Sequence, residues 1–549
     1  MIDTINLINI HNNRGDNVSS ISSLSRAVSG LRANQQALQS TAHNLANVNT
    51  PGYVRQQILM KESNYLKIGT SGNSNLMVGM GTDVECLRQV RDMFLDGAFR
   101  NEASRYGYYR SGAETVQEIE TVLGEIEGES METVLNKFYK SLNELSKHPD
   151  GREARGTFVQ SAVLFVNKAN LVMEQLNEYQ LNLNKQVIDN VDEINRLGEE
   201  IDRLNKEIVK YELNGDNAND YRDARNLALD KLSHIVDITY SEDKTGNVNV
   251  KAEGHNLVSV DHVYKIELEQ SVPNSPLVSP IWEDTGKRVF NLDTEISAER
   301  ENDKGSLKGL LMARGTRQAN WMDTKKADEY NKNVKPSILM TAQAKFDLFV
   351  HSVVTTINDI VAPRGKGTDS PYGLDGSQNI EVFKRINMDR YNGSTYNGED
   401  KTNYSSLYSA GNLEINPEIL NDYDKICITE DLTKVQDNNI VEDIIKKWQE
   451  PNITEYPGCE AKLNINKYYI SFVGEIGNLG KSARTQMDNQ QILVAQIDNQ
   501  RSTFMGVSSD EELGNMMKYQ HAYNASARVV TVVDQMLDQV INRLGIVGR

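Results

Sequence analysis

The stretch "NLANVNTPGYVRQQ", residues 44–57, ends a helical pattern abruptly and decides how the chain is laid out. Pro51 disfavours the α conformation at Thr50, so a helix that arrives from the N-terminal side must stop there. Gly52 can adopt a positive φ, and the neighbouring asparagine side chains can bond to backbone groups that a helix end leaves free. The stretch therefore predicts a corner that turns the chain out of a long helix. Pro and Gly alone fit a plain helix-ending turn equally well.

The helix before this corner is predicted over residues 19–47. Apolar residues recur there at alternating steps of four and three, with Gln35 in the one gap, which is typical of a helix that packs on other helices. Serines near residue 19 offer N-cap oxygens. Only Arg26 and Arg32 are charged, so we expect the helix to be covered on several sides. The apolar positions are Leu24, Val28, Leu31, Leu38, Ala42 and Leu45.

The far end of the chain has a similar pattern over residues 511–544. Acidic residues precede it, where a helix N-terminus favours negative charge, and Gly545 ends it. The apolar positions are Leu513, Met516, Tyr519 or Gln520, Tyr523, Ala527, Val530, Val533, Leu537, Val540 and Leu544. Most helical stability comes from packing such a stripe, so neither end is expected to fold alone. The two ends form either an ordinary terminal bundle or helices that also pair with neighbouring subunits of a polymer.

Between the two ends, residues 90–235 are predicted to be almost entirely helical, because apolar residues recur in them at helical intervals. One long helix is expected over residues 153–213, with alternating charges outside a coiled-coil-like seam. The seam residues are Val187, Val191, Ile194, Ile201, Leu204, Ile208 and Tyr211.

After residue 236, apolar and polar residues alternate, which predicts β-strands, and residues 244–247 carry a hairpin signal. Residues 305–360 are again predicted to be helical. Residues 363–470 are rich in Asn, Asp, Gly and Tyr and mostly lack a helical period, which predicts a β-rich or irregular surface domain. Helix is expected to return near residue 482 and to continue to the end, with a break around residues 504–509.

The chain thus goes out through helices, into a β-containing middle and back through helices, so its two ends must meet. We predict a mixed α and β, multidomain, elongated fold with discontinuous domains. The terminal α-helices are expected to pair as a coiled-coil-like bundle, beside a long helical-bundle domain and β-rich outer domains. The predicted domains are a terminal helical domain (1–60 with 508–549), a helical bundle (61–236 with 305–362 and 471–507), a β-containing domain (237–304) and a β-rich or irregular surface domain (363–470).

Length and charge exclude several classes of protein. A chain of 549 residues is too long for one core, so two to four domains are expected. The net charge of −18 repels nucleic acid and anionic membranes, so we expect no nucleic-acid partner. No apolar run is long enough to cross a bilayer, so no membrane insertion is expected. The first residues lack a basic region followed by an apolar core, so no cleaved secretory signal is expected either.

Motifs of catalysis and metal binding are missing from the sequence. It contains no H-E-x-x-H or paired C-x-x-C motif, no P-loop or strand-bounded G-x-G-x-x-G and no G-x-S-x-G elbow. We therefore expect no metal, no cofactor and no catalytic site, and a protein that is not an enzyme. The three cysteines, Cys86, Cys427 and Cys459, are far apart and odd in number, so they indicate small buried hydrophobes or free thiols and no disulfide framework.

Two terminal motifs carry a family resemblance. The stretch "LSRAVSGLRANQQALQSTAHNLANVNTPGYVRQQ" (24–57) resembles the N-terminal motif of bacterial flagellar axial proteins of the rod, hook and hook-associated classes. The stretch "EELGNMMKYQHAYNASARVVTVVDQMLDQVINRLG" (511–545) resembles their C-terminal motif. The N-terminal matches are Ser29-Gly30-Leu31, Ala37-Leu38, Asn44-Leu45-Ala46-Asn47 and Asn49-Thr50-Pro51-Gly52-Tyr53.

Inner segments are similar to the hook-associated class at the hook–filament junction. They are "METVLNKFYKSLNELSKHPDGREARGTFVQSA" (131–162), "NDYRDARNLALDKLSHIVDITYSEDKTGNVNV" (219–250), "KGSLKGLLMARG" (304–315) and "LEINPEIL" (413–420). The resemblance has gaps at residues 270–300 and 363–405. Two other functions stay open, namely another axial protein such as the hook subunit, and an extracellular enzyme carried in residues 363–470.

The resemblance implies a structural subunit that self-assembles as a ring at the distal hook. Its expected partners are further copies of itself, the hook protein, the next hook-associated junction protein and a cytoplasmic export chaperone. The flagellar type III apparatus would export it without a cleaved signal, and its terminal helices would form the inner tube. The expected assembly residues are Leu24, Val28, Leu31, Leu38, Asn44, Leu45, Asn47, Asn49, Thr50, Pro51, Gly52, Tyr53, Tyr519, Tyr523, Val530, Val533, Leu537, Val540 and Leu544. The chaperone would bind Val530, Val533, Leu537, Val540 and Leu544.

Overall fold

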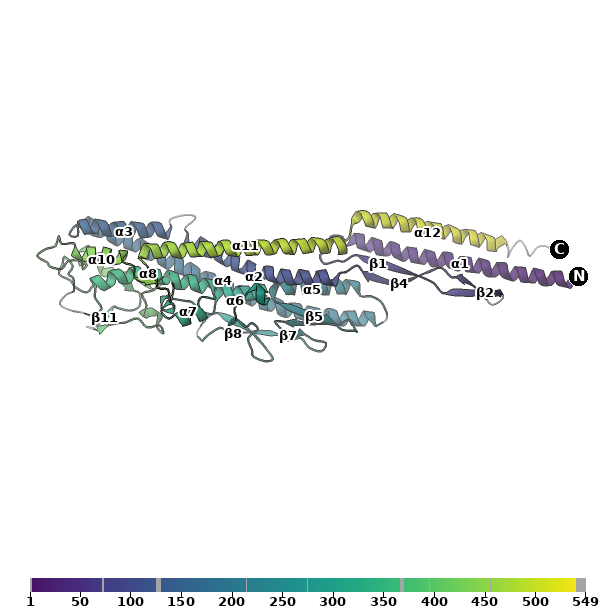
Figure 1. Ribbon diagram of the computed structural model, residues 1–549, viewed down its shortest axis with the longest axis horizontal. Helices are drawn as coiled ribbons and strands as arrows, with labels where there is room; N and C mark the ends of the chain where they lie inside the picture. Colours follow the sequence, from purple (N-terminus) through teal and green to yellow (C-terminus); the bar gives the residue numbers. More distant parts are fainter. Residues whose placement is uncertain are drawn as a thin grey trace.

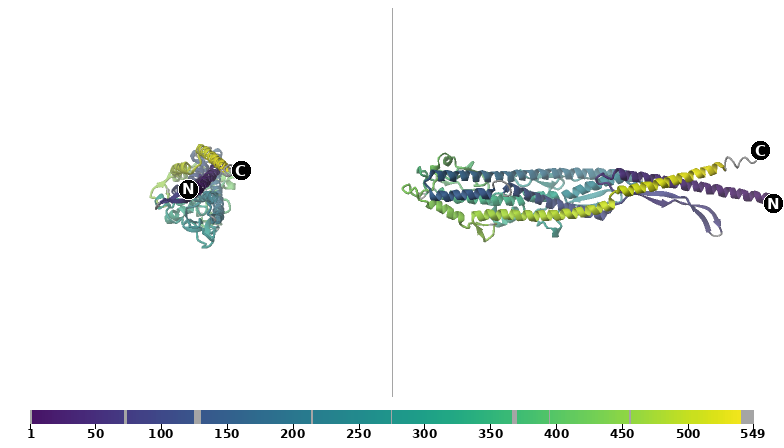
Figure 2. Two further views of the ribbon diagram at one scale, coloured as in Figure 1. Left: turned by 90° about the vertical axis from the view of Figure 1, so that its right-hand side faces the viewer. Right: turned by 90° about the horizontal axis from the view of Figure 1, so that it is seen from above.

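The molecule is long and narrow, with the first and the last helix side by side at one end (Figure 1; Figure 2). The computed structural model describes residues 2–71, 74–124, 130–213, 215–273, 275–365, 370–393, 395–454 and 456–539. Most of these residues are helical, and the strands form several small separate sheets. The predicted mixed, elongated fold whose two ends meet is therefore confirmed.

The terminal part is built on the helices α1 (Ile2–Ala46) and α12 (Ser509–Asp538), which pack along each other. Two antiparallel strand pairs follow α1, and β1 and β4 of these pack against it. The strands are β1 (Gln56–Glu62), β2 (Tyr65–Ser71), β3 (Ser74–Gly79) and β4 (Thr82–Gln89). The predicted domain boundary at residue 60 falls inside β1, and the domain limits stay a prediction.

The start of α1 differs from the prediction, because the helix begins at Ile2 and not near residue 19. The serines that were expected to cap it lie inside the helix. Nothing in residues 2–18 forces an end, since this stretch contains no proline and only one glycine. A local cap signal is therefore not enough to start a helix where the preceding residues can continue it.

The body of the molecule is a bundle in which α2 packs along α11, and α4 spans the body from the end next to the terminal helices to the far end (Figure 1). The helices are α2 (Met93–Leu123), α3 (Met131–Lys147), α4 (Arg152–Glu212), α5 (Asn219–Ile235), α6 (Ser306–Arg314), α7 (Ala327–Asn333), α8 (Ile338–Val361) and α11 (Ile465–Met505). Four of them lie in residues 90–235, as predicted. The break predicted between residues 504 and 509 separates α11 from α12.

Local signals explain where several of these helices begin and end. Asp92 caps α2 by accepting hydrogen bonds from the backbone N–H groups of Phe94 and Leu95. Gly124 ends the same helix in the left-handed conformation, with a φ of 66°. Ser130 caps α3 in the same way as Asp92 caps α2. Such caps satisfy the backbone groups that a helix end leaves without a partner.

Most of the predicted seam of α4 packs in the main hydrophobic core. Its six aliphatic residues, Val187, Val191, Ile194, Ile201, Leu204 and Ile208, are all buried. The seventh, Tyr211, is exposed and stacks on Tyr221 of α5 with ring centroids 5.2 Å apart. The coiled-coil spacing thus predicted the buried face correctly up to the last turn of the helix.

The β-containing middle packs on α4. An antiparallel sheet holds β5 (Ile238–Glu242), β6 (Val248–Ala252) and β7 (His255–Val258), and a separate pair holds β8 (Ile266–Gln270) and β9 (Val278–Trp282). The hairpin predicted at residues 244–247 joins β5 to β6. In it Asp243 accepts from the backbone N–H groups of Thr245 and Asn247, and Gly246 has a φ of 88°.

Residues 370–463 are irregular, with short strand pairs as predicted and one amphipathic helix that was not predicted. The strands are β10 (Phe383–Arg385), β11 (Tyr391–Asn392), β12 (Thr395–Tyr396), β13 (Leu413–Ile415), β14 (Ile453–Thr454) and β15 (Lys462–Leu463). The helices are α9 (Pro417–Asn421) and α10 (Asn439–Gln449), and short 3-10 turns occur at Tyr404–Ser406 and Tyr423–Lys425. Two further 3-10 turns, at Ala298–Arg300 and Trp321–Thr324, lie before this segment. α10 buries Val441, Ile444 and Trp448 on one face. The helix has only eleven residues, so its apolar period is hard to recognise in the sequence.

This irregular segment shares the core of the body. Phe138 of α3 lies with its ring centroid 5.5 Å from that of Phe158, 6.1 Å from Phe383 and 5.8 Å from Trp448. α11 also begins earlier than predicted, at Ile465 and not near residue 482, because Asn464 caps it by accepting from the backbone N–H of Lys467. The start of α11 therefore belongs to the same core.

No helix in the described part of the chain is long and apolar enough to cross a bilayer. Among the same residues, no three His, Cys, Asp or Glu side chains are grouped so that they could hold a metal ion.

Candidate subunit-assembly surface

The two terminal helices run antiparallel in a defined register. At one level the side chain of Asn44 in α1 donates to Glu512 at the start of α12. At another, a Cβ atom placed on Gly30 would lie 3.3 Å from the hydroxyl oxygen of Ser526. As the residue number falls along α1 it rises along α12, so each level of one helix has a fixed partner level on the other.

Small residues form most of the buried surface of α1, which packs on α12 and on strands β1 and β4. The most buried positions between residues 22 and 46 are Ser22, Ala27, Ala33, Ala37, Ser40, Thr41 and Asn44. Helices approach each other more closely where the contacting side chains are small. The leucines and valine predicted to carry assembly, Leu24, Val28, Leu31, Leu38 and Leu45, are each only half-buried. They lie at the margins of this contact and keep part of their apolar surface open.

The contact face of α12 includes most of its predicted positions. Val533 is buried, and Tyr519, Tyr523, Val530 and Leu537 are half-buried. Val540 and Leu544, which were predicted for both assembly and chaperone binding, lie outside the described residues. Leu513, the first position of the predicted stripe, is 46% exposed and lies on the other side of the helix. The rest of the described stripe packs on α1 within the same chain.

The opposite side of α12 carries large apolar side chains that the described part of the chain leaves exposed. Its exposed residues are Leu513, Met517, Val529, Val532 and Met536, with exposed fractions between 46% and 59%. At about 100° of rotation per residue, these five positions fall within one half of the helix, away from Val533 and Tyr519. We call this surface the outer face of α12. Its residues form two groups, one at Leu513 and Met517 and one from Val529 to Met536. Exposed apolar groups on one side of a helix are typical of interaction sites in soluble proteins.

Asn44 is the centre of the corner that follows α1. Its side-chain amide donates to the backbone oxygen of Gln56 (2.9 Å) and to the carboxylate of Glu512 (3.2 Å). Its side-chain oxygen accepts from the backbone N–H of Gln56 (3.0 Å) and from the hydroxyl of Tyr53 (2.8 Å). The residue is only 1% exposed. One buried amide therefore ties together the end of α1, the start of β1 and the start of α12.

The rest of the predicted corner motif is a turn on the surface. Asn47 accepts from the backbone N–H and from the hydroxyl of Thr50, while its own amide donates to the oxygen of His43. Asn49, Thr50, Pro51 and Gly52 are exposed. Gly52 has a φ of 78°, and a Cβ there would lie 3.1 Å from Leu227, so the predicted need for glycine is met.

Tyr53 binds the corner back onto the end of α1. Its hydroxyl lies 3.0 Å from Nδ1 of His43 and donates to Asn44. Burial raises the pKa of Tyr53 strongly, and the carboxylates of Asp220, Asp223 and Glu512 raise it further. The hydroxyl therefore stays protonated and acts as a hydrogen-bond donor.

An ion pair that was not predicted ties α12 to the corner. Glu512 is 2% exposed, and its carboxylate accepts from Nε of Arg55 at 2.8 Å. Arg55 also lies 3.3 Å from Glu511, and its backbone N–H donates to the oxygen of Met505 at the end of α11. Arg55 and Glu512 are 457 residues apart in the sequence, so no local pattern could have paired them.

Buried charges continue this joint into the body. Asp223 of α5 accepts from the backbone N–H of Val54 and from the side chain of Gln89, and burial raises its pKa to about 7. Arg501 of α11 lies 2.9 Å from Asp96 of α2 and 2.7 Å from Asp230 of α5. The joint between the terminal part and the body is therefore polar.

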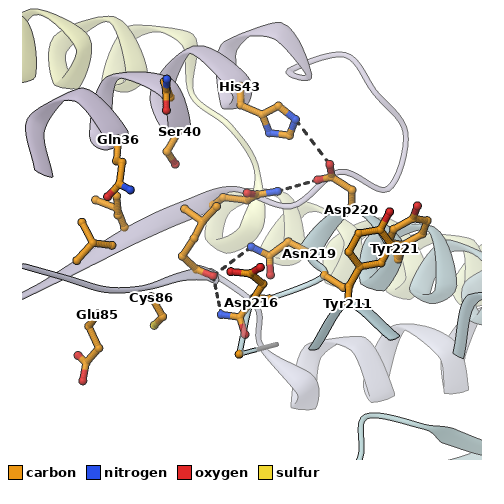
Figure 3. Close-up of a pocket in the computed structure, with 18 of the residues that line it drawn as sticks. Gln36, Ser40, His43, Glu85, Cys86, Tyr211, Asp216, Asn219, Asp220 and Tyr221 are labelled. Atoms are coloured by element: carbon orange, nitrogen blue, oxygen red, sulfur yellow. Dashed lines mark hydrogen bonds and ion pairs between the residues drawn. The ribbon is translucent and has the colours of Figure 1, made fainter. Parts of the chain in front are cut away.

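A cleft of about 820 Å³ opens beside this joint (Figure 3). It lies between α1, strand β4 and the turn that connects α4 to α5. Asp220 reaches across it to Gln56 at 2.9 Å, and lies 3.8 Å from His43. We call it the joint cleft; the side chains of α1 that line it are Gln36, Gln39, Ser40 and His43.

Family models match three parts of the chain. The helical domain of the flagellar hook-associated protein FlgK matches residues 116–377. The C-terminal model of the flagellar basal body rod proteins FlgEFG matches residues 494–544, and the model of the flagella basal body rod protein matches residues 24–53. The last two cover the terminal helices that form the surface described above.

Flagellar hook-associated protein 1 of Bacillus subtilis (strain 168) is 30% identical over 547 residues, which cover 96% of this chain and 99% of that protein. The chain belongs to the flagellar hook-associated protein 1 family. The Escherichia coli (strain K12) member is 25% identical over 94% of this chain and 99% of its own length. The flagellar hook junction protein FlgK from Burkholderia pseudomallei has a similar fold, with a TM-score of 0.52 and 12% identity over 75% of this chain and all of that one.

Membership of this family decides between the functions that the sequence left open. The chain is a hook–filament junction protein of the bacterial flagellum, a structural component and not an enzyme. The resemblance of the terminal motifs to flagellar axial proteins is thereby confirmed. As a flagellar axial protein it assembles with the proteins of the hook and filament.

Proposed function

We propose that this junction protein assembles as a ring on the distal end of the hook through its two terminal helices, between the hook protein and the next hook-associated junction protein. The observation that carries the proposal is the outer face of α12. Five large apolar side chains on a single helix stay exposed in one copy of the chain. Covering them by neighbouring subunits removes apolar surface from water, which is the main favourable term in most protein associations.

The distribution of the core supports the same conclusion. Within the described residues, the clusters of buried apolar side chains begin at Val116 and contain no residue of α1, α12 or strands β1 to β4. Among the described residues, the terminal pair is held by its helix-to-helix contact, by β1 and β4 against α1 and by the polar joint, without a large apolar core. Helices of this kind depend on packing for their stability, and a ring of neighbours would supply it.

In this proposal the predicted assembly residues have two different tasks. The half-buried Leu24, Leu31 and Leu38, with the outer face of α12, contact neighbouring subunits. The corner residues Asn44 and Tyr53 act inside the chain, because their polar groups are bonded to the joint. They orient the terminal helices relative to the body, whose β-containing parts lie away from the tube axis.

The test is electron microscopy of purified hooks that lack junction proteins, incubated with the full chain. A thin layer at the distal end only, which then permits the next junction protein to bind, is the expected result. Replacing Val529 and Val532 by serine should raise the concentration needed for half-occupied hook ends about tenfold, because both side chains lose their buried contacts. The matched control replaces Leu164 and Leu171 of α4, which are equally exposed, by serine.

The control variant should cap hooks as well as the wild type does. Growth of long tubes by the chain alone would instead indicate a polymerising axial subunit. Absence of any layer would contradict ring assembly at the hook, and equal effects of the two serine variants would contradict the role of α12.

We further propose that the chain leaves the cell through the flagellar type III apparatus, held beforehand by a cytoplasmic chaperone at Val530, Val533, Leu537, Val540 and Leu544. In the folded chain, Val533 is buried against α1. The chaperone and α1 therefore compete for the same face of α12. Chaperone binding requires that α12 be separated from α1, as it is before folding.

A disulfide between the two helices tests this competition. The full chain would carry Gly30→Cys and Ser526→Cys, with Cys86 and Cys459 changed to serine, because the Cβ of residue 30 would lie near residue 526. The oxidised protein is expected to lose binding of the export chaperone by at least about tenfold, and reduction should restore it. The variant with Gly30→Cys alone is the control. Equal chaperone affinity of the oxidised and the reduced protein would refute the competition.

A further inference from the structure

Charge is distributed very unevenly along this acidic chain. The net charge is −18, yet residues 22–46 and 513–533 contain four Lys or Arg side chains and no Asp or Glu. They are Arg26, Arg32, Lys518 and Arg528, and all four are exposed. In the part of the chain that the structure describes, none of them forms an ion pair with a carboxylate. The middle of the terminal helix pair is thus a cationic zone on an anionic protein.

Two of these cations lie on the outer face of α12. Counted at about 100° per residue, Lys518 and Arg528 fall in the same half of the helix as Met517, Val529 and Val532. The side that packs on α1 is the opposite one. The outer face therefore combines apolar side chains with positive charge, and it can recognise a surface that is both apolar and acidic.

The joint cleft has this complementary character. Four carboxylates line it, Asp83, Glu85, Asp216 and Asp220, and its lining contains no Lys or Arg. All four residues are exposed. Asp83 lies opposite Lys61 in the β1–β4 pair, and Asp220 lies 3.8 Å from His43. The apolar part of the lining includes Ile58, Val84 and Leu87.

A buried hydroxyl in the wall of the joint cleft has no partner. Ser40 is 9% exposed, and its hydroxyl oxygen has no hydrogen-bond partner among the described residues. It points from α1 toward the cleft (Figure 3). Buried polar groups are almost always hydrogen-bonded, so an unpaired one beside an open cleft indicates that a further group binds there.

We propose that the outer face of α12 in one copy of the chain docks into the joint cleft of a second copy. The occupant cannot be α12 of the same copy, because its outer face points away from α1 whereas the cleft lies against α1. The contact joins two different surfaces, so it is heterologous and can repeat around a ring. This inference rests on the proposed ring assembly and names the surfaces that meet in it.

Charge reversal on both sides tests the docking in the hook-end assay with the full chain. Lys518→Glu with Arg528→Glu, and separately Glu85→Lys with Asp216→Lys, should each raise the half-occupying concentration about tenfold or more, because like charges then face each other. Combining all four changes should bring it back to within about threefold of the wild type, because the charges are again complementary. All variants are first shown to melt like the wild type.

The matched control is Lys185→Glu with Lys481→Glu, which makes the same change in net charge on exposed positions of α4 and α11. It should cap hooks like the wild type. The docking is overturned if the fourfold variant is as defective as the two double variants. Lys518 and Arg528 would then contact a surface other than the joint cleft. It is also overturned if the double variants cap hooks normally. A wild-type chain that fails to cap hooks would overturn the ring assembly itself.

Discussion

Replacing Asn44 by alanine is expected to release the terminal helix pair from the joint, at a cost of about 3 kcal/mol in local stability. The change removes a buried side-chain amide that both donates and accepts hydrogen bonds. The backbone N–H and oxygen of Gln56 lose their partner at once, and the hydroxyl of Tyr53 keeps only His43 among the described residues. The buried carboxylate of Glu512 then keeps only Arg55. Buried polar groups without partners are costly, so the joint should open more often.

Hydrogen exchange of the backbone amides in α12 measures this opening. Faster exchange in α12 and in residues 44–57, with unchanged exchange in α4, is the expected pattern. Asn49→Ala is the matched control, because Asn49 lies exposed in the same corner. If the two variants showed the same exchange rates in α12, the hydrogen bonds of Asn44 would not hold α12 at the joint, and this prediction would be wrong.

Replacing Phe138 by alanine is expected to destabilise the whole body by about 4 kcal/mol. The ring of Phe138 is fully buried and lies between rings contributed by α4, β10 and α10. Its removal leaves a cavity where the irregular segment 370–463 meets the helical bundle. Because the two share this core, they should unfold in one transition and not in two.

Unfolding in guanidinium chloride, followed by tryptophan fluorescence and by circular dichroism, checks this result. The matched control is Phe94→Ala, since Phe94 is 81% exposed and its removal should change the stability by less than about 0.5 kcal/mol. Separate transitions for fluorescence and circular dichroism would mean that residues 370–463 fold independently, as the sequence pattern had suggested.

Much of the fold could be predicted because its signals are local. The helical period of α4 identified six of its buried residues, and Pro51 with Gly52 marked the corner. The hairpin at residues 244–247 was recognised by its turn residues. Periods and chain-breaking residues act over a few positions, so a single sequence shows them. The terminal motifs also led to the flagellar family, which the comparisons confirm.

Other features depended on contacts that no local signal shows. The buried surface of α1 consists mostly of small residues and Asn44, whereas the leucines that define its apolar period are half-buried at the margins. The burial of α10 follows from the shared core around Phe138, to which Trp448 belongs.

By itself the sequence determined that this protein has two long terminal helices, a corner after the first and a helical body. Only the tertiary structure decided which faces meet. Arg55 and Glu512 pair across 457 residues, and the cationic outer face of α12 turns away from α1 because Val533 packs inward. The physical reason is that helix formation is set by neighbours in the chain. The choice of a partner is set by the free energy of burying one face in preference to another.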